Sequence, residues 1–336
     1  EPTFELHDVT IGKGFHWERR ETQKFAGALK IIVENNGLTA INVIGVEDYL
    51  LSVISSEMSQ NSPEEFLKAH AVISRSWVMA QLAHDRKITC DAAERESFRK
   101  CRNIEDVVTW LAMHRNAVRN EPPAPESHSG EMEYVRWYDH SDHRNFDVCA
   151  DDHCQRYQGL TRATEVSVQK AIDATWGQVL TFGGELCDAR FSKCCGGTAE
   201  LFSTCWADED KEYLQALPDT PGHLPDGSRN VDGTAVVPFC SLADSALLAR
   251  VFNSYDRETS DFYRWTEVYE LGELSALVSE KSGVDIGELT ALESLGKGPS
   301  GRIFRLRVVG TKDSFVVGKE LEIRRILSPS HLRSSA

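Results

Sequence analysis

Hydrophobic and polar residues alternate with the period of strands over the first part of the chain, residues 4–45. Two runs rich in β-branched and apolar residues, 29–34 and 38–44, flank the turn signal Asn-Asn-Gly at 35–37. We therefore predict strands in this region and a β-hairpin over residues 29–44.

The period changes at residue 46, where apolar residues begin to recur at helical spacing. The apolar positions are Val46, Tyr49, Leu50, Val53 and Ile54. Glu47, Asp48 and Ser52 lie between them and define a polar face. This pattern predicts an amphipathic helix.

A second helix is predicted from an N-cap pattern at residues 62–65, in which Pro follows Ser and Glu stands three positions after the Ser. We expect this helix to end near residue 82. Residues 85–142 then change character, being charged, mixed and interrupted by a Pro-rich stretch at 120–127. This composition favours an inserted, partly helical segment with a long loop.

Beyond the insertion, predicted helices and strands occur in separate blocks. The expected elements are a short helix at 164–173, a hairpin of 178–182 and 185–191, a helix at 271–282, and strands at 302–309 and 314–317. Segregated blocks favour an α+β fold. We expect one domain, residues 1–84 and 143–336, interrupted by the insertion.

The chain is acidic, with 52 Asp and Glu against 37 Lys and Arg and a net charge of −15. Because it also lacks a block of basic residues, a nucleic acid partner is excluded. No apolar stretch reaches the roughly 18 residues that span a bilayer. The chain opens on Glu1-Pro2 without an initiator Met, which leads us to expect a mature exported protein.

Glu57 is the most informative residue of the first predicted helix. It lies three positions after Ile54 and four after Val53, so it continues the apolar face. Burial disfavours the charged form of a carboxyl, and a Glu that keeps its proton near neutral pH can act as a general acid. The alternative is a Glu at a frayed helix end that turns to water.

Lys68 and Arg75 lie seven positions apart on the second predicted helix, with Ala71 between them. This basic stripe belongs either to a site or to a solvated helix face. His70 lies on the side of Phe66 and is expected to be a packed core histidine without a catalytic role.

The nine cysteines are an odd number and cannot all pair. Four candidate metal ligands, His143, Cys149, His153 and Cys154, lie within twelve residues, and Cys149 and His153 would share a face if the segment were helical. The pattern predicts a structural zinc site that holds residues 143–157 in place. The alternative is a buried thiol with exposed histidines nearby.

Several stretches form an ordered set of motifs along the chain. They are Val46 to Leu50, Ser56 to Met58, Leu67 to Ser76, His153 to Tyr157, Gly177 to Phe182, Ala189 to Gly197 and Ser300 to Arg325. Together they resemble the signature of the SpoIID/LytB family and cover most of the chain outside 85–142. The chain departs from the family pattern at His70, usually Gln, at Ser76, usually Thr, and at residues 193–195, where Lys-Cys-Cys replaces small hydroxyl residues.

The resemblance implies a SpoIID-like catalytic domain in which a two-helix unit packs on antiparallel β-structure. Family members are lytic transglycosylases that cut peptidoglycan glycan strands between MurNAc and GlcNAc, leaving 1,6-anhydroMurNAc, with the Glu of the Ser-Glu-Met motif as the catalyst. Carried over, this makes Glu57 the single acid/base and Ser56, Lys68, Arg75 and Ser192 the substrate-binding residues. It also implies a sporulation-related protein of the periplasm or cell wall, with glycan strands as its partner.

Two alternative functions stay open. Family members have also been described as enhancers of a cell-wall amidase, so the chain could be a non-catalytic cell-wall-binding protein. A thiol hydrolase built on Cys149 and His153 is the second alternative, although no third residue to orient the pair is evident. A glycoside hydrolase would need a second carboxylate, and Glu47 and Asp48 are expected to face away from Glu57.

Overall fold

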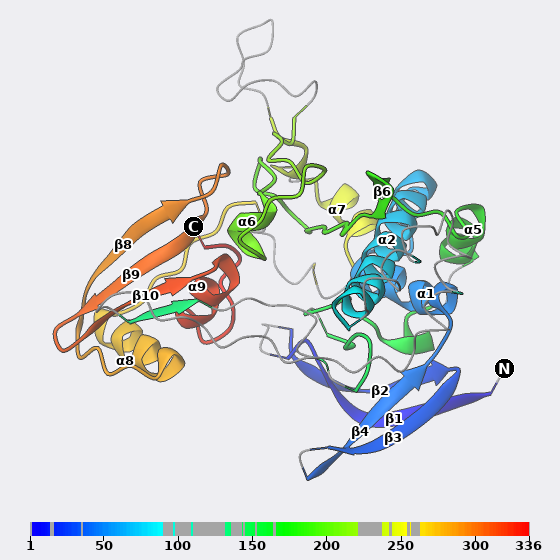
Figure 1. The fold of residues 1–336 in the computed structure, drawn as a ribbon, viewed down its shortest axis with the longest axis horizontal. Helices are drawn as coiled ribbons and strands as arrows, with labels where there is room; N and C mark the ends of the chain where they lie inside the picture. Colours follow the sequence, from blue (N-terminus) through cyan, green and yellow to red (C-terminus); the bar gives the residue numbers. More distant parts are fainter. Residues whose placement is uncertain are drawn as a thin grey trace, which may run out of the picture.

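The computed structural model shows a mixed α+β chain of helices and several small sheets, as the sequence predicts (Figure 1). It describes residues 2–13, 17–34, 36–89, 132–135, 145–151, 153–163, 166–220, 237–241, 244–253 and 263–335, with the single residues 97, 109, 143 and 256. Most of the predicted insertion, residues 85–142, therefore lies outside the described residues.

Two antiparallel hairpins open the chain. Strands β1 (Thr3–Ile11) and β2 (Arg19–Ala26) form the first, and β3 (Ala28–Glu34) and β4 (Gly37–Val43) form the second. The second is the hairpin predicted from the Asn-Asn-Gly signal, and Asn36 has the positive φ of 61° that such a turn requires.

Helix α1 (Val46–Glu57) begins where the hydrophobic period changes, and α2 (Glu64–Thr89) begins just after the predicted cap. Helix α2 is about two turns longer than predicted, because residues 83–89 contain neither Gly nor Pro to end it. The predicted polar face of α1 is partly wrong. Ser52 is only 2% exposed, because its hydroxyl accepts the backbone N–H of Gln158 at 3.0 Å.

The first hydrophobic core joins α1 and α2 to α5 (Val166–Ala174), with both α1 and α2 contributing fully buried side chains. These include Leu50, Val53, Ile54, Leu67, Met79, Val168 and Ile172. An aromatic chain links this core to the first hairpin, because Phe4 stacks on Phe25, and Tyr157 packs between Phe25 and Tyr49. The first hairpin thus contacts the helix core through these aromatic side chains.

The C-terminal part builds a second core around a four-stranded sheet of order β5-β10-β9-β8 (Figure 1). Its elements are β5 (Glu133–Val135), β8 (Leu289–Lys297), β9 (Ile303–Gly310), β10 (Ser314–Gly318), α8 (Leu271–Ser282) and α9 (Glu320–Ile326). Helix α8 and strands β9 and β10 were predicted, whereas β8 and α9 were not. Strand β8 is mostly exposed, so its sequence carries no regular alternation of apolar residues.

Between the two cores lie the short hairpin β6 (Thr181–Phe182) and β7 (Glu185–Leu186), and the helices α6 (Phe202–Cys205) and α7 (Ser245–Val251). The last residue of α7 contacts the segment that follows α1: the backbone N–H of Ser59 donates to the carbonyl of Val251 at 2.8 Å. Among the described helices, none has the length and apolar character to cross a membrane.

Candidate functional site

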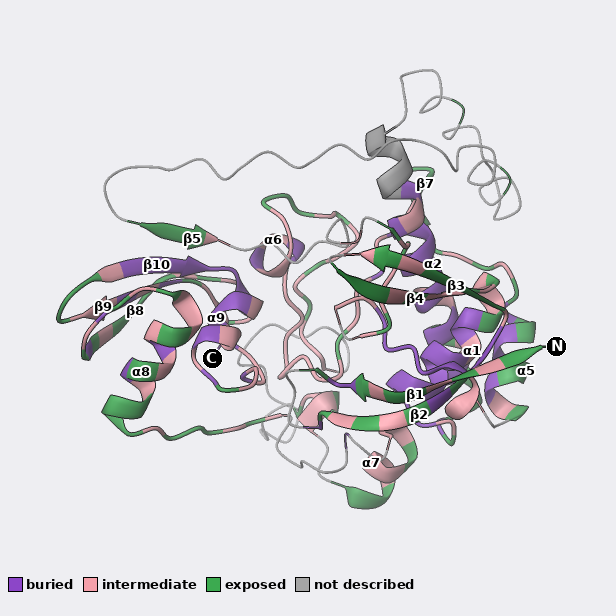
Figure 2. Cartoon of the chain, turned by 90° about the horizontal axis from the view of Figure 1, so that it is seen from below, coloured by how far each residue is buried: buried purple, intermediate pink, exposed green. Residues whose placement is uncertain are grey.

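Most of α1 is buried (Figure 2), and its last residue, Glu57, is 9% exposed, so the apolar-face position predicted from its spacing leads to burial. Its Oε1 accepts the backbone N–H of Arg156 at 2.8 Å. Burial and the negative end of the helix dipole favour the protonated carboxyl, whereas the N–H of Arg156 favours the carboxylate. The hydrogen bond from Arg156 fixes the position of the Glu57 carboxyl at the end of α1.

Arg156 holds a buried polar cluster beside Glu57. Its guanidinium lies 4.2 Å from the centre of the Trp17 ring, donates to the carbonyl of Ser56 at 3.4 Å and is 3.6 Å from the carboxylate of Asp256. Asp256 is 2% exposed and also pairs with Lys193 at 2.5 Å. Asp256 pairs with both Arg156 and Lys193, so these contacts hold Arg156 in place with its backbone N–H on Glu57.

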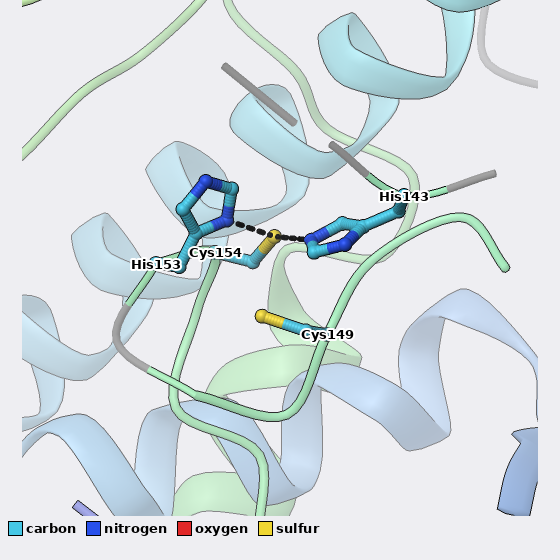
Figure 3. A group of neighbouring side chains, drawn as sticks. All are labelled: His143, Cys149, His153 and Cys154. Carbon is cyan, nitrogen blue, oxygen red and sulfur yellow. Dashed lines mark hydrogen bonds between the residues drawn. The ribbon is translucent and has the colours of Figure 1, made fainter. Parts of the chain in front are cut away.

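The four predicted metal ligands converge, with all their ligand atoms within 4.8 Å of one another (Figure 3). The Sγ of Cys154 lies 3.2 Å from Nε2 of His143 and 3.5 Å from Nδ1 of His153. They belong to an irregular loop, so the helical i, i+4 pairing of Cys149 with His153 was wrong. The tight loop brings the residues together instead.

The geometry and chemistry of this cluster fit a zinc ion. Ideal tetrahedral zinc bonds place a nitrogen and a sulfur ligand about 3.6 Å apart, close to the two distances from Cys154. Contact with the Cys154 thiol lowers the pKa of the Cys149 thiol, while the reciprocal contact raises that of Cys154. Each thiol would release its proton on binding a metal, and the lowered pKa of Cys149 favours this release. The four residues can bind a metal.

Residues 154–158 connect this cluster directly to the Glu57 site. Next to Cys154, the amide of Gln155 accepts from the hydroxyl of Tyr49 at 3.1 Å and donates to the carbonyl of Ser74 at 3.3 Å. The following residue is Arg156. Burial raises the pKa of Tyr49, and the charges of Cys154 and Glu57 add to this rise. The Cys/His cluster and Glu57 thus both affect the pKa of the Tyr49 hydroxyl.

Arg75 and Lys68 occupy different environments. Arg75 is fully buried and makes a bidentate pair with Glu47, at 2.8 and 2.5 Å, while its third nitrogen donates to the carbonyl of Gln178 at 3.0 Å. Glu47 is therefore drawn inward and is not part of a solvated face. Lys68 is partly exposed at the start of α2 and pairs with Glu64, 2.7 Å away, which raises its pKa.

The remaining sequence candidates divide between interior and surface. Ser56 is buried, and its hydroxyl has no hydrogen-bond partner among the described residues. Ser192 is exposed. His70 is 3% exposed, packs edge-on against Phe191 and has a pKa lowered by burial to about 4, so the packed core histidine is confirmed.

The best-formed cavity, of about 270 Å³, does not contain Glu57. Asp48, Ser52, Tyr157 and Gly159 contribute to its lining. Because Glu57 does not line it, we assign this cavity no role in the chemistry of Glu57.

Sequence reasoning missed the residues that surround Glu57, above all Arg156, Asp256 and Lys193. Arg156 follows the Cys/His motif and could have been noticed as a charged residue between buried positions. Asp256 lies outside any periodic element, so no pattern in the sequence distinguishes it.

Comparison with known proteins divides the chain into two matched regions. Residues 34–121 and 128–182 match the family described as stage II sporulation protein, SpoIID, and residues 200–336 match a domain of unknown function, DUF8618. An uncharacterized protein of Brachyspira hyodysenteriae (strain ATCC 49526 / WA1) is 38% identical over 56 residues, which are 17% of this chain. The alignment covers 15% of that relative.

Proposed function

Since the chain carries a SpoIID domain over residues 34–182, we propose that it is a peptidoglycan lytic transglycosylase with Glu57 as its acid/base. The family resemblance drawn from the motifs is confirmed over these residues. A SpoIID domain implies a role in sporulation or cell-wall remodelling, and the family includes lytic transglycosylases. The observation that carries the proposal is the buried Glu57 carboxyl held by the N–H of Arg156.

In the proposed reaction, Glu57 first donates its proton to the glycosidic oxygen between MurNAc and GlcNAc, and the bond from MurNAc C1 to that oxygen breaks. The carboxylate then accepts the proton of the MurNAc C6 hydroxyl as its oxygen bonds to C1. At the end of the cycle Glu57 is protonated again, and no water has been consumed. The product end is 1,6-anhydroMurNAc.

One carboxyl suffices for this cycle because it alternates between two protonation states. Burial at the end of α1 favours the acid, and the N–H of Arg156 stabilises the carboxylate once the proton has left. Hydrolysis would need a second carboxylate free to activate water or stabilise the cation. Glu47 and Asp256 are both held in buried ion pairs, so neither suits that task.

The residues predicted to bind substrate differ in their exposure to solvent. Lys68 and Ser192 reach the surface and are proposed to contact the sugar chain. Ser56 was expected to bind substrate, but it is 2% exposed, so we propose that it supports the site beside Glu57 from the interior. Arg75 is fully buried, so we propose that it supports the site by joining α1 to α2 and not by touching substrate.

Zinc held by His143, Cys149, His153 and Cys154 is proposed to be structural. It would supply a rigid cross-link within the 143–157 loop. The loop then presents the backbone N–H of Arg156 to Glu57. Because glycan strands lie outside the cytoplasmic membrane, we propose that the protein acts after export, in the periplasm or at the cell wall.

Digestion of purified glycan strands, with and without a cell-wall amidase, tests the proposal. Mass spectrometry should detect 1,6-anhydroMurNAc ends in both digests. Reducing ends that contain an added water would instead identify a hydrolase. No glycan cleavage together with faster amidase turnover would identify the non-catalytic enhancer.

A further inference from the structure

A second group of ligand-type side chains lies outside the Glu57 site and outside the first Cys/His cluster. The Sγ atoms of Cys195 and Cys240 and a carboxylate oxygen of Asp219 lie within 4.8 Å of one another. The three residues come from separate parts of the chain: the loop after β7, the loop after α6, and the 3-10 helix Phe239–Ser241. These residues are distant in the sequence, and the tertiary structure brings them together.

The spacing of the two sulfurs fits a shared metal better than a disulfide. The Sγ atoms of Cys195 and Cys240 are 3.6 Å apart. Two thiolates bound to a tetrahedral zinc ion lie about 3.8 Å apart, whereas disulfide sulfurs lie about 2.05 Å apart. A thiol-to-thiol hydrogen bond gives a similar distance, and the carboxylate of Asp219, within 4.8 Å of both sulfurs, adds a third group of metal-ligand type.

Asp219 is oriented by contacts of the kind that surround metal ligands. Its Oδ2 accepts the backbone N–H of Cys240 at 2.8 Å. Its own backbone donates to the carbonyl of Gly197 at 2.9 Å and accepts from the N–H of Phe239 at 2.8 Å. Hydrogen bonds that fix a carboxylate in this way position it as a ligand with little loss of entropy on binding.

The local charge also suits a divalent cation. Two thiolates, one carboxylate and a divalent ion leave a net charge of −1. Guanidinium groups lie directly beside the ligands, because Arg302 donates to the carbonyl of Cys195 and Arg264 donates to the carbonyl of Gly196 at 3.0 Å. These arginines offset the residual negative charge.

We propose that Cys195, Asp219 and Cys240 bind a second zinc ion, distinct from the one assigned to the first cluster. Sulfur-rich sets of this kind select zinc over the harder magnesium and calcium ions. Each thiol releases its proton as its bond to the metal forms, so binding releases two protons. The fourth position is taken by the Cys194 thiol, whose Sγ lies 3.8 Å from the carbonyl of Cys240, or by water.

This zinc would fix the position of the loop that contacts the Glu57 environment. Lys193 lies two residues before Cys195 and pairs with Asp256, which in turn pairs with Arg156. The metal would thus anchor Lys193 from outside the SpoIID region. It accounts for the departure at residues 193–195, where the family has small hydroxyl residues.

Zinc counting on the full chain, purified without added metal, tests the proposal and is independent of catalysis. We expect about two zinc ions per wild-type chain and about one in a Cys195→Ser, Cys240→Ser variant. A Cys149→Ser, Cys154→Ser variant should lose the other ion. Cys187→Ser, a buried cysteine in neither group, is the matched control and should retain both.

If the double variant does not fold, Asp219→Asn provides the test, because it keeps the acceptor for the N–H of Cys240 but weakens the metal bond. Zinc release to a chelator should then become faster for one ion only. In cobalt-substituted protein, a weaker thiolate-to-metal band in Cys194→Ser would identify the fourth ligand as Cys194, and an unchanged band would identify it as water. Unchanged zinc content in the Cys195→Ser, Cys240→Ser variant, or a disulfide-linked peptide joining these cysteines, would overturn the proposal.

Discussion

Replacing Glu57 by Gln removes the proton that the proposed reaction transfers while keeping the size of the side chain. The amide oxygen can still accept the N–H of Arg156, now 2.8 Å from the Oε1 of Glu57. The buried surroundings, in which Glu57 is 9% exposed, therefore change little in packing. The substitution therefore tests the proton transfer by Glu57 while leaving the packing around it nearly unchanged.

The expected losses differ for activity and stability. General acid/base catalysis contributes roughly 10²- to 10⁴-fold to rate, which corresponds to about 2.7–5.4 kcal/mol of barrier. Turnover of glycan strands should fall by at least this factor. The melting temperature should stay unchanged or rise slightly, because a neutral amide is cheaper to bury than a carboxyl.

The assay is the release of anhydro-muropeptides per unit time from purified glycan strands, measured beside a thermal melt. Glu273→Gln, the same chemical change at an exposed position of α8, is the matched control and should leave both quantities unchanged. Full activity in Glu57→Gln would refute the catalytic assignment. A lower melting temperature with intact turnover would make Glu57 a structural residue.

Three further changes follow from the described contacts. Arg75→Met should lower the free energy of unfolding in urea by about 3–5 kcal/mol, because it leaves the Glu47 carboxylate uncompensated; a change near zero would contradict the anchoring role. The folded-state pKa of His70, about 4 against an ordinary 6.5, means that stability is lost as pH falls from 6.5 towards 4, by up to about 3 kcal/mol. His70→Gln should reduce the pH dependence of stability in melts recorded from pH 7 to 4. An equally steep loss of stability in this variant would show that His70 is not the group responsible. Cys149→Ser with Cys154→Ser should reduce activity by releasing the loop that carries Arg156, with Glu57 intact; wild-type turnover after loss of that zinc would show the metal dispensable.

Local sequence patterns were sufficient for elements whose signals lie within a few residues. The β3–β4 hairpin follows from Asn-Asn-Gly, and α1 follows from the spacing of Val53 and Ile54. The same spacing predicted the burial of Glu57. The convergence of four ligands could be predicted because they lie within twelve residues.

Long-range contacts account for what could not be predicted. Ser52 and Glu47 looked solvated because helical spacing shows only which face is polar. Ser52 is buried and Glu47 is half-buried, each against a partner from a distant segment. The pairing of Asp256 with Arg156 joins residues one hundred positions apart. Periodicity contains no information about such pairs.

The parallel pairing of β5 with β10 brings residues of the two matched regions into one sheet. Strand β5 lies in the SpoIID region and β10 in the DUF8618 region, and Glu133 pairs with Val316 across 183 positions of chain. During synthesis β5 emerges early and must wait for β10, so the sheet is completed late, after a large loop has closed. A chain cut between the two regions would leave β10, with Phe315, Val316 and Val317 buried, as an uncovered apolar edge prone to pair with another molecule. We therefore expect a chain divided between the two matched regions to aggregate more readily than the intact chain.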